Sequence, residues 1–105
     1  MDKTPHIEPM TSKEISEGFK SLGYDVRSLT TYLSAFREWS EVNGLPTPSK
    51  GGKYAYDLVA FNGYCQRKLK YIAKNAPQST YKKAKTLKTL VILSSKLIDN
   101  LGGLK

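Results

Sequence analysis

The chain has 105 residues, and its 17 Lys and Arg side chains against 9 Asp and Glu give a formal net charge of +8 at pH 7. This length fits one hydrophobic core and excludes a large two-domain enzyme, while the single cysteine excludes an internal disulfide and a cysteine-based zinc site. No apolar run approaches the roughly 18 residues of a membrane span, and no secretory leader is visible, so we expect a soluble, cytoplasmic protein with no membrane partner.

Residues 1–10 carry two prolines and no apolar periodicity, which predicts a flexible tail. A first helix begins after Thr11, because Thr11 and Glu14 stand at the spacing of a capping box. Gly18 weakens this helix and Gly23 ends it. Its apolar stripe consists of Ile15, Phe19 and Leu22.

A second helix has either Asp25 or Ser28 as its N-cap and stops at Asn43 and Gly44. Its apolar positions repeat with the helical period. They are Leu29, Tyr32, Leu33, Phe36, Trp39 and Val42. Residues 45–53 contain two prolines and two glycines, which predicts a loop without regular structure.

A third helix is expected to start within residues 54–57, with Leu58, Phe61, Cys65, Leu69 and Ile72 facing inward. A fourth opens at residues 78–80. Its inward positions are Tyr81, Ala84, Leu87, Val91 and either Leu97 or Ile98. The only competing strand signal is the short alternation at residues 53–56. Four helices joined by short loops predict an all-α, compact four-helix bundle.

The positive charge is confined to the second half of the chain. Residues 1–57 hold seven basic and eight acidic side chains, whereas residues 58–105 hold ten basic and one acidic. No carboxylate occurs between Leu58 and Ile98 to neutralise the lysines by intrahelical pairing. A solvated surface is the ordinary explanation of a lysine run, but this complete lack of acids favours a nucleic-acid partner.

The sequence offers no catalytic set. His6 lies in the tail, Cys65 takes a core-facing helical position, and the spaced pairs Glu14 with Glu17 and Glu38 with Glu41 fall on exposed faces. The segment at residues 50–53 lacks the Gly-Lys-Ser/Thr order of a phosphate-binding loop. We therefore expect no catalytic residue, no metal site, no cofactor and no small-molecule substrate.

The start of the fourth helix favours a polyanion instead. Free backbone N–H groups at residues 78–80 and the positive end of the helix dipole suit a phosphate. Lys82, Lys83 and Lys85 add charge within two turns, and Ser79 also serves as the N-cap. Tyrosines among these lysines at helical spacing are more typical of core or rim positions than of base stacking.

Three segments resemble the N-terminal, SAM-like core-binding domain of tyrosine recombinases, the phage and mobile-element integrases. They are residues 31–39 (TYLSAFREW), 43–48 (NGLPTP) and 79–83 (STYKK). The resemblance covers residues 11–101 and implies a SAM-like bundle that forms half of a clamp around duplex DNA. It also implies that residues 102–105 begin a linker to a separate catalytic domain, so this chain alone is not an enzyme. Its expected partners are double-stranded DNA, that catalytic domain and other recombinase protomers.

The DNA contacts expected from charge and resemblance together lie on three helices. They are Thr30, Arg37, Arg67, Lys70, Lys74, Ser79, Thr80, Lys82, Lys83 and Lys85. The chain departs from the family pattern at Asp25, whose carboxylate would repel DNA, at Lys85, where an apolar residue is usual, and in its strongly basic third helix.

Two alternatives stay open. In a winged-helix, excisionase-like DNA-binding regulator, the first two helices would form a helix-turn-helix and residues 48–56 the wing, with strand pairing at residues 54–56. In a helical protein-interaction module, the basic face would dock on an acidic partner.

Overall fold

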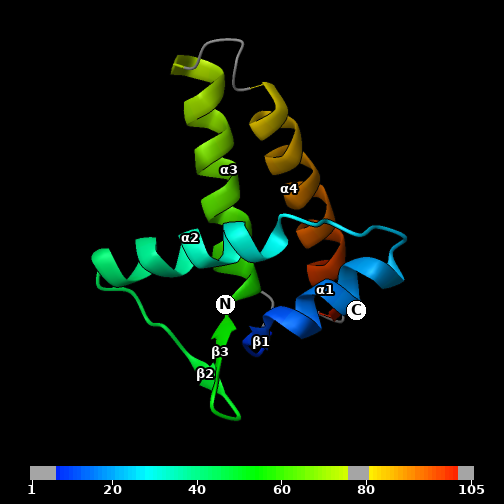
Figure 1. The fold of residues 1–105 in the computed structure, drawn as a ribbon, viewed down its shortest axis with the longest axis vertical. Helices are drawn as coiled ribbons and strands as arrows, with labels where there is room; N and C mark the ends of the chain where they lie inside the picture. The colour runs from blue at the N-terminus through cyan, green and yellow to red at the C-terminus, as the bar shows by residue number, and fades with distance from the viewer. Residues whose placement is uncertain (1–6, 76–80, 102–105) are drawn as a thin grey trace, which may run out of the picture.

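The structure is a computed structural model, and it describes residues 7–75 and 81–101. In chain order the elements are β1 (Met10–Thr11), α1 (Ser12–Ser21), α2 (Leu29–Val42), β2 (Ser49–Lys50), β3 (Lys53–Tyr56), α3 (Leu58–Asn75) and α4 (Tyr81–Leu101). Figure 1 shows α3 and α4 side by side and running in opposite directions, with α2 crossing in front of them and the sheet below. The molecule is mostly helical, but the sheet corrects the all-α prediction.

Helix α1 begins as its sequence predicts. The backbone N–H of Glu14 donates to Thr11 Oγ1 at 3.2 Å, and the backbone N–H of Thr11 donates to Glu14 Oε1 at 2.9 Å, so the capping box is complete. The helix packs closely on α4, because a Cβ at Gly18 would lie 2.8 Å from Leu97 Cδ2. The glycine that weakens α1 therefore permits this close approach.

Helix α2 buries Leu29, Leu33 and Phe36 against the rest of the core. Ser28 occupies the N-cap position, although its side chain makes no capping bond. Trp39 is half-buried, and its ring lies 5.3 Å from that of Tyr64 on α3. The inward placement predicted for Val42 is wrong, since Val42 is 85% exposed where α2 ends.

A β-hairpin, residues 49–56, replaces most of the predicted loop. Strands β2 and β3 pair antiparallel, and Gly51 and Gly52 between them have φ angles of 59° and 79°. Positive φ at both central residues is the geometry of a tight two-residue hairpin turn, and glycine adopts it without strain. Strand β1 pairs with the other edge of β3, which gives the order β1-β3-β2. The strand pairing expected only by the winged-helix alternative is thus confirmed.

Helices α3 and α4 form a long antiparallel pair, called the helical pair below. Asp57 caps α3 by accepting a hydrogen bond at Oδ1 from the backbone N–H of Ala60. Inside the pair, Asn62 Nδ2 donates to Ser94 Oγ at 2.7 Å and to the carbonyl of Val91 at 3.1 Å. Because a buried amide needs its partners, this network fixes how α3 sits against α4.

The core draws on every helix and on β3. Its largest fully buried side chains include Ile15, Phe19, Leu33, Leu58, Phe61, Leu87, Leu90 and Leu93. On α4 the buried stripe includes Leu90 and Leu93, whereas the predicted Val91 is only half-buried. Residues 1–6 of the tail expected at 1–10, the expected opening of the fourth helix at residues 78–80 and the expected linker at 102–105 lie outside the described residues. Met10, at the end of that tail, instead pairs with Tyr56 in the sheet.

Candidate nucleic-acid interface

The exposed ridge of α2 is polar and changes in charge along its length. Thr30, Thr31 and Ser34 are exposed on its first two turns, and Arg27 is exposed just before them. The next exposed positions on the same side are Glu38 and Glu41. The N-terminal half of α2, which also carries the positive end of the helix dipole, is therefore the half suited to approach an anion.

Arg37 does not point outward as the DNA contact that its sequence position predicted. Its Nη1 donates to the carbonyls of Pro48 and Ala55 at 3.0 and 3.1 Å, and its Nη2 donates to the carbonyl of Thr47 at 2.9 Å. The guanidinium also lies 3.9 Å from the centre of the Tyr54 ring, and only 11% of the side chain is exposed. Arg37 thus joins α2 to strand β3 of the β-hairpin and to the segment directly before β2.

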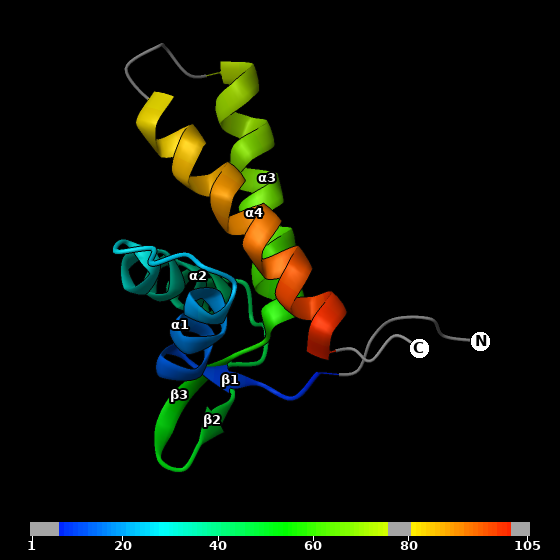
Figure 2. The ribbon, with the colours of Figure 1, turned by 90° about the vertical axis from the view of Figure 1, so that its right-hand side faces the viewer.

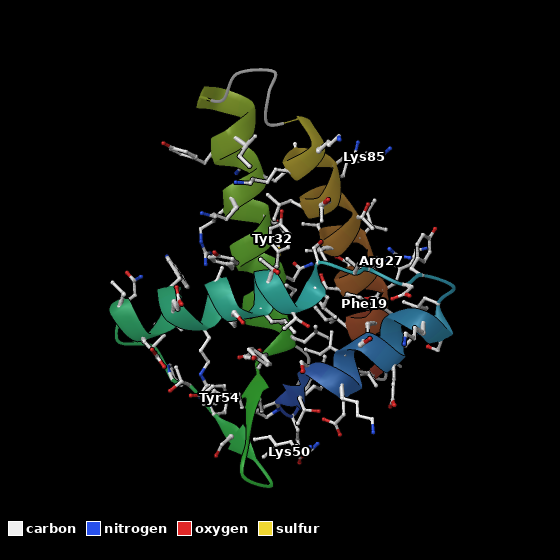
Figure 3. All side chains as sticks on the ribbon, in the orientation of Figure 1. Phe19, Arg27, Tyr32, Lys50, Tyr54 and Lys85 are labelled. Atoms are coloured by element: carbon white, nitrogen blue, oxygen red, sulfur yellow. The ribbon has the colours of Figure 1, made fainter. Side chains whose placement is uncertain are left out.

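A second contact joins the β-hairpin to α1. Lys50 Nζ lies 3.2 Å from Glu14 Oε2. The pKa of Glu14 is held below its usual value, first by the backbone N–H of Thr11 and then by Lys50. Lys53 and Tyr54 remain exposed on the β-hairpin, and Figure 3 shows Tyr54 and Lys50 at the lower end of the molecule, below α2.

On α3, the predicted contacts Arg67 and Lys70 are exposed together with Lys68. The guanidinium of Arg67 lies 5.1 Å from the centre of the Trp39 ring, a cation–π contact with α2. The backbone of Lys74 continues α3, but its side chain lies outside the described residues.

On α4, the predicted contacts Lys82, Lys83 and Lys85 are exposed, as are Lys88 and Lys96. Ser79 and Thr80 lie outside the described residues. Within residues 81–101 the only acid is Asp99, and no ion pair involves these lysines among the side chains that the structure describes.

The basic residues of the helical pair do not share one flank. Residues three or four apart lie on one side of a helix, so Arg67 and Lys70 share an outward face of α3, and Lys82, Lys85 and Lys88 share an outward face of α4. Since the two helices pack against each other along their buried stripes, these two faces point in opposite directions. The DNA contacts expected from the sequence include residues of both faces.

Three further observations on the described residues concern catalysis, metal binding and membrane spans. Burial raises the pKa of the Cys65 thiol to about 12, which makes it a poor nucleophile. Within residues 7–75 and 81–101, no three His, Cys, Asp or Glu side chains come together as metal ligands. No helix in these two segments has the length and apolar character needed to cross a membrane. His6 lies outside them.

Comparisons of this chain with protein-family models, with curated proteins and with solved structures found no match.

Sequence reasoning missed part of this surface. Arg27, Thr31, Ser34 and Lys53 were not among the expected contacts. For Lys53 the available signal was the Gly51-Gly52 dipeptide directly before the alternating residues 53–56, a combination typical of a tight β-hairpin.

Proposed function

We propose that this chain binds double-stranded DNA as a winged-helix regulator, with α1 and α2 as its helix-turn-helix and the β-hairpin as its wing. The observation that carries this proposal is the succession β1-α1-α2-β2-β3 with sheet order β1-β3-β2. This topology holds the β-hairpin next to α2, and Arg37 links the two directly. The proposal accordingly replaces the recombinase domain as the favoured function.

In this proposal α2 enters the major groove by its N-terminal half. An α-helix fits that groove, and the second helix of a helix-turn-helix reads base edges with its first turns. The hydroxyls of Thr30, Thr31 and Ser34 can donate to or accept from base edges. Glu38 and Glu41 in the C-terminal half of α2 would repel phosphates, so we expect the N-terminal half to insert deepest into the major groove.

The β-hairpin then lies beside the groove. Its turn consists of two glycines, which let the backbone come close to a phosphate or a groove wall. Lys53 is exposed beside that turn and supplies a positive charge. The net charge of +8 over the whole chain also supports a polyanionic partner.

Selection from a pool of random duplexes, followed by fluorescence anisotropy on the selected duplex, tests the proposal. We expect a defined site to be enriched. Replacing Thr31→Asp and Ser34→Asp together places two carboxylates in the groove, and we expect at least about tenfold weaker binding, equivalent to about 1.4 kcal/mol. Asn100→Asp, an exposed change at the far end of α4, is the control and should change affinity less than about twofold.

Two results would contradict the proposal. One is the absence of duplex binding at low salt. The other is competition by heparin that equals competition by duplex DNA, with no enriched site, which would favour the protein-interaction module.

A recombinase core-binding domain is a second candidate, because residues 31–39, which carry part of the resemblance, lie within α2, and the described residues form four successive helices. In that case the chain would be one half of a DNA clamp with a SAM-like bundle. The parent reading frame would carry a downstream Arg…His-x-x-Arg…Tyr set, and sequencing beyond Lys105 distinguishes the two candidates.

A further inference from the structure

The proposed contact of α2 and the β-hairpin has few free positive charges. Residues 7–57 contain six basic and seven acidic side chains. Of the six, Lys50 is paired with Glu14, and Arg37 is taken up by backbone carbonyls. DNA-binding affinity depends strongly on the number of phosphate charges that Lys and Arg neutralise. Tight binding by α2 and the β-hairpin therefore requires positive charges from another part of the molecule.

The helical pair holds that charge. Residues 58–101 contain nine basic side chains and one acid. On α4, Lys82, Lys85 and Lys88 recur every third residue on the side away from the buried Leu87, Leu90 and Leu97. These three lysines are called the α4 row below.

Lys85, the middle residue of the α4 row, lies on the same side of the molecule as the start of α2. Figure 3 shows Lys85 and Arg27 on the right-hand side, with Arg27 below Lys85 at the turn that leads into α2. Figure 2 views the molecule from that side and shows the first turns of α4 above α2 and the β-hairpin below α2. A duplex lying along α2 would thus have the β-hairpin on one flank and the α4 row on the other.

The basic residues of α3 are placed differently. In Figure 1 α3 lies to the left of α4, and Figure 3, in the same orientation, labels Arg27 at the right, on the other side of α4 from α3. Arg67 on that helix lies against Trp39, in the C-terminal half of α2 where Glu38 and Glu41 are exposed.

We propose that the α4 row, together with Arg27, binds the phosphate backbone of the same duplex that α2 reads, on the flank of α2 opposite the β-hairpin. This inference rests on the proposed function and assigns affinity to α4 and sequence preference to α2. The row, Arg27 and Lys53 make about five phosphate contacts, for which log K falls against log salt with a slope of about −4.5.

Two matched triple variants test the inference. Lys82→Gln/Lys85→Gln/Lys88→Gln removes the α4 row, and Arg67→Gln/Lys68→Gln/Lys70→Gln removes the same number of exposed charges from α3. Anisotropy titrations of the selected duplex between 50 and 200 mM salt give the slope for each, and circular dichroism shows that each is folded. We expect the α4 variant to lower the slope to about −1.8 and the affinity at 0.1 M salt by two orders of magnitude or more. We expect the α3 variant to keep the wild-type slope to within about 0.5.

Equal losses in the two triple variants, or an unchanged slope in the α4 variant, would overturn the inference. The single variants Lys85→Gln and Lys70→Gln repeat the comparison should a triple variant not fold. Failure of the proposed function is distinct from these outcomes, because it shows as an absence of duplex binding by the wild type or as no effect of Thr31→Asp and Ser34→Asp.

Discussion

Replacing Arg37 tests whether this side chain holds the β-hairpin to α2 or binds DNA, as its sequence position suggested. Three carbonyls, those of Thr47, Pro48 and Ala55, accept hydrogen bonds of 2.9 to 3.1 Å from the guanidinium of a side chain that is only 11% exposed. Hydrogen bonds to a charged group contribute about 1.5–3 kcal/mol each, and the contact with Tyr54 adds about 0.5–1 kcal/mol.

These contributions share one side chain, and water can reach the freed carbonyls, so they do not add fully. We expect Arg37→Ala to lower the free energy of unfolding by about 2–4 kcal/mol. Arg37→Lys keeps the charge but loses the planar fork that serves several acceptors at once, and we expect a loss of about 1–3 kcal/mol. Urea unfolding followed by circular dichroism measures both.

The same variants give the opposite pattern if Arg37 binds a phosphate. In that case Arg37→Ala would leave stability within about 0.5 kcal/mol of the wild type, and it would lower the salt slope of DNA binding by about 0.9. We expect instead an unchanged slope, measured where the variant is folded, with a weaker preference for the selected site because the β-hairpin is no longer fixed beside α2.

Four further predictions concern single residues. The pKa of Glu14 is lowered in the folded protein, so the stabilisation by its ionised carboxylate is fully present above the ordinary value of 4.5 and is lost as the pH falls through the lowered value. Glu14→Gln should therefore flatten the loss of the urea midpoint between pH 5 and pH 3. A parallel loss in both proteins would contradict this. With a thiol pKa of about 12, Cys65 should resist iodoacetamide in the folded protein at pH 8 and react fully in urea, and rapid labelling without urea would show that the thiol is accessible. Gly52→Ala forces alanine into positive φ and should lower the free energy of unfolding in urea by about 1 kcal/mol. Asn62→Ala removes the amide that donates to Ser94 and should lower it by about 1–3 kcal/mol. A change below about 0.3 kcal/mol would contradict either prediction.

The helices could be predicted from the sequence because their signals are local. The Thr11 and Glu14 spacing marks the start of α1, and Leu29, Leu33 and Phe36 mark the buried face of α2. Both depend only on neighbours within a few turns of helix. Val42 was wrongly predicted to face inward, because the periodicity of one helix does not show where the elements packed against it end.

The sheet depends on distant partners and was therefore harder to predict. Residues 10 and 11 pair with residues 55 and 56, and no local pattern announces that pairing. Arg37 was misassigned for the same reason: its three acceptors are carbonyls 10 to 18 positions further along the chain. The division of the basic residues between opposite faces also required the packing of α3 on α4.

The central claim is that α2 and the β-hairpin meet the same duplex, and amide chemical shifts recorded while the selected duplex is added test it most directly. The account predicts the largest shift changes at residues 27–34 and 51–54, with further changes at residues 82–88 and little change at residues 66–71. Changes confined to residues 66–71, with residues 27–34 and 51–54 unaffected, would contradict it.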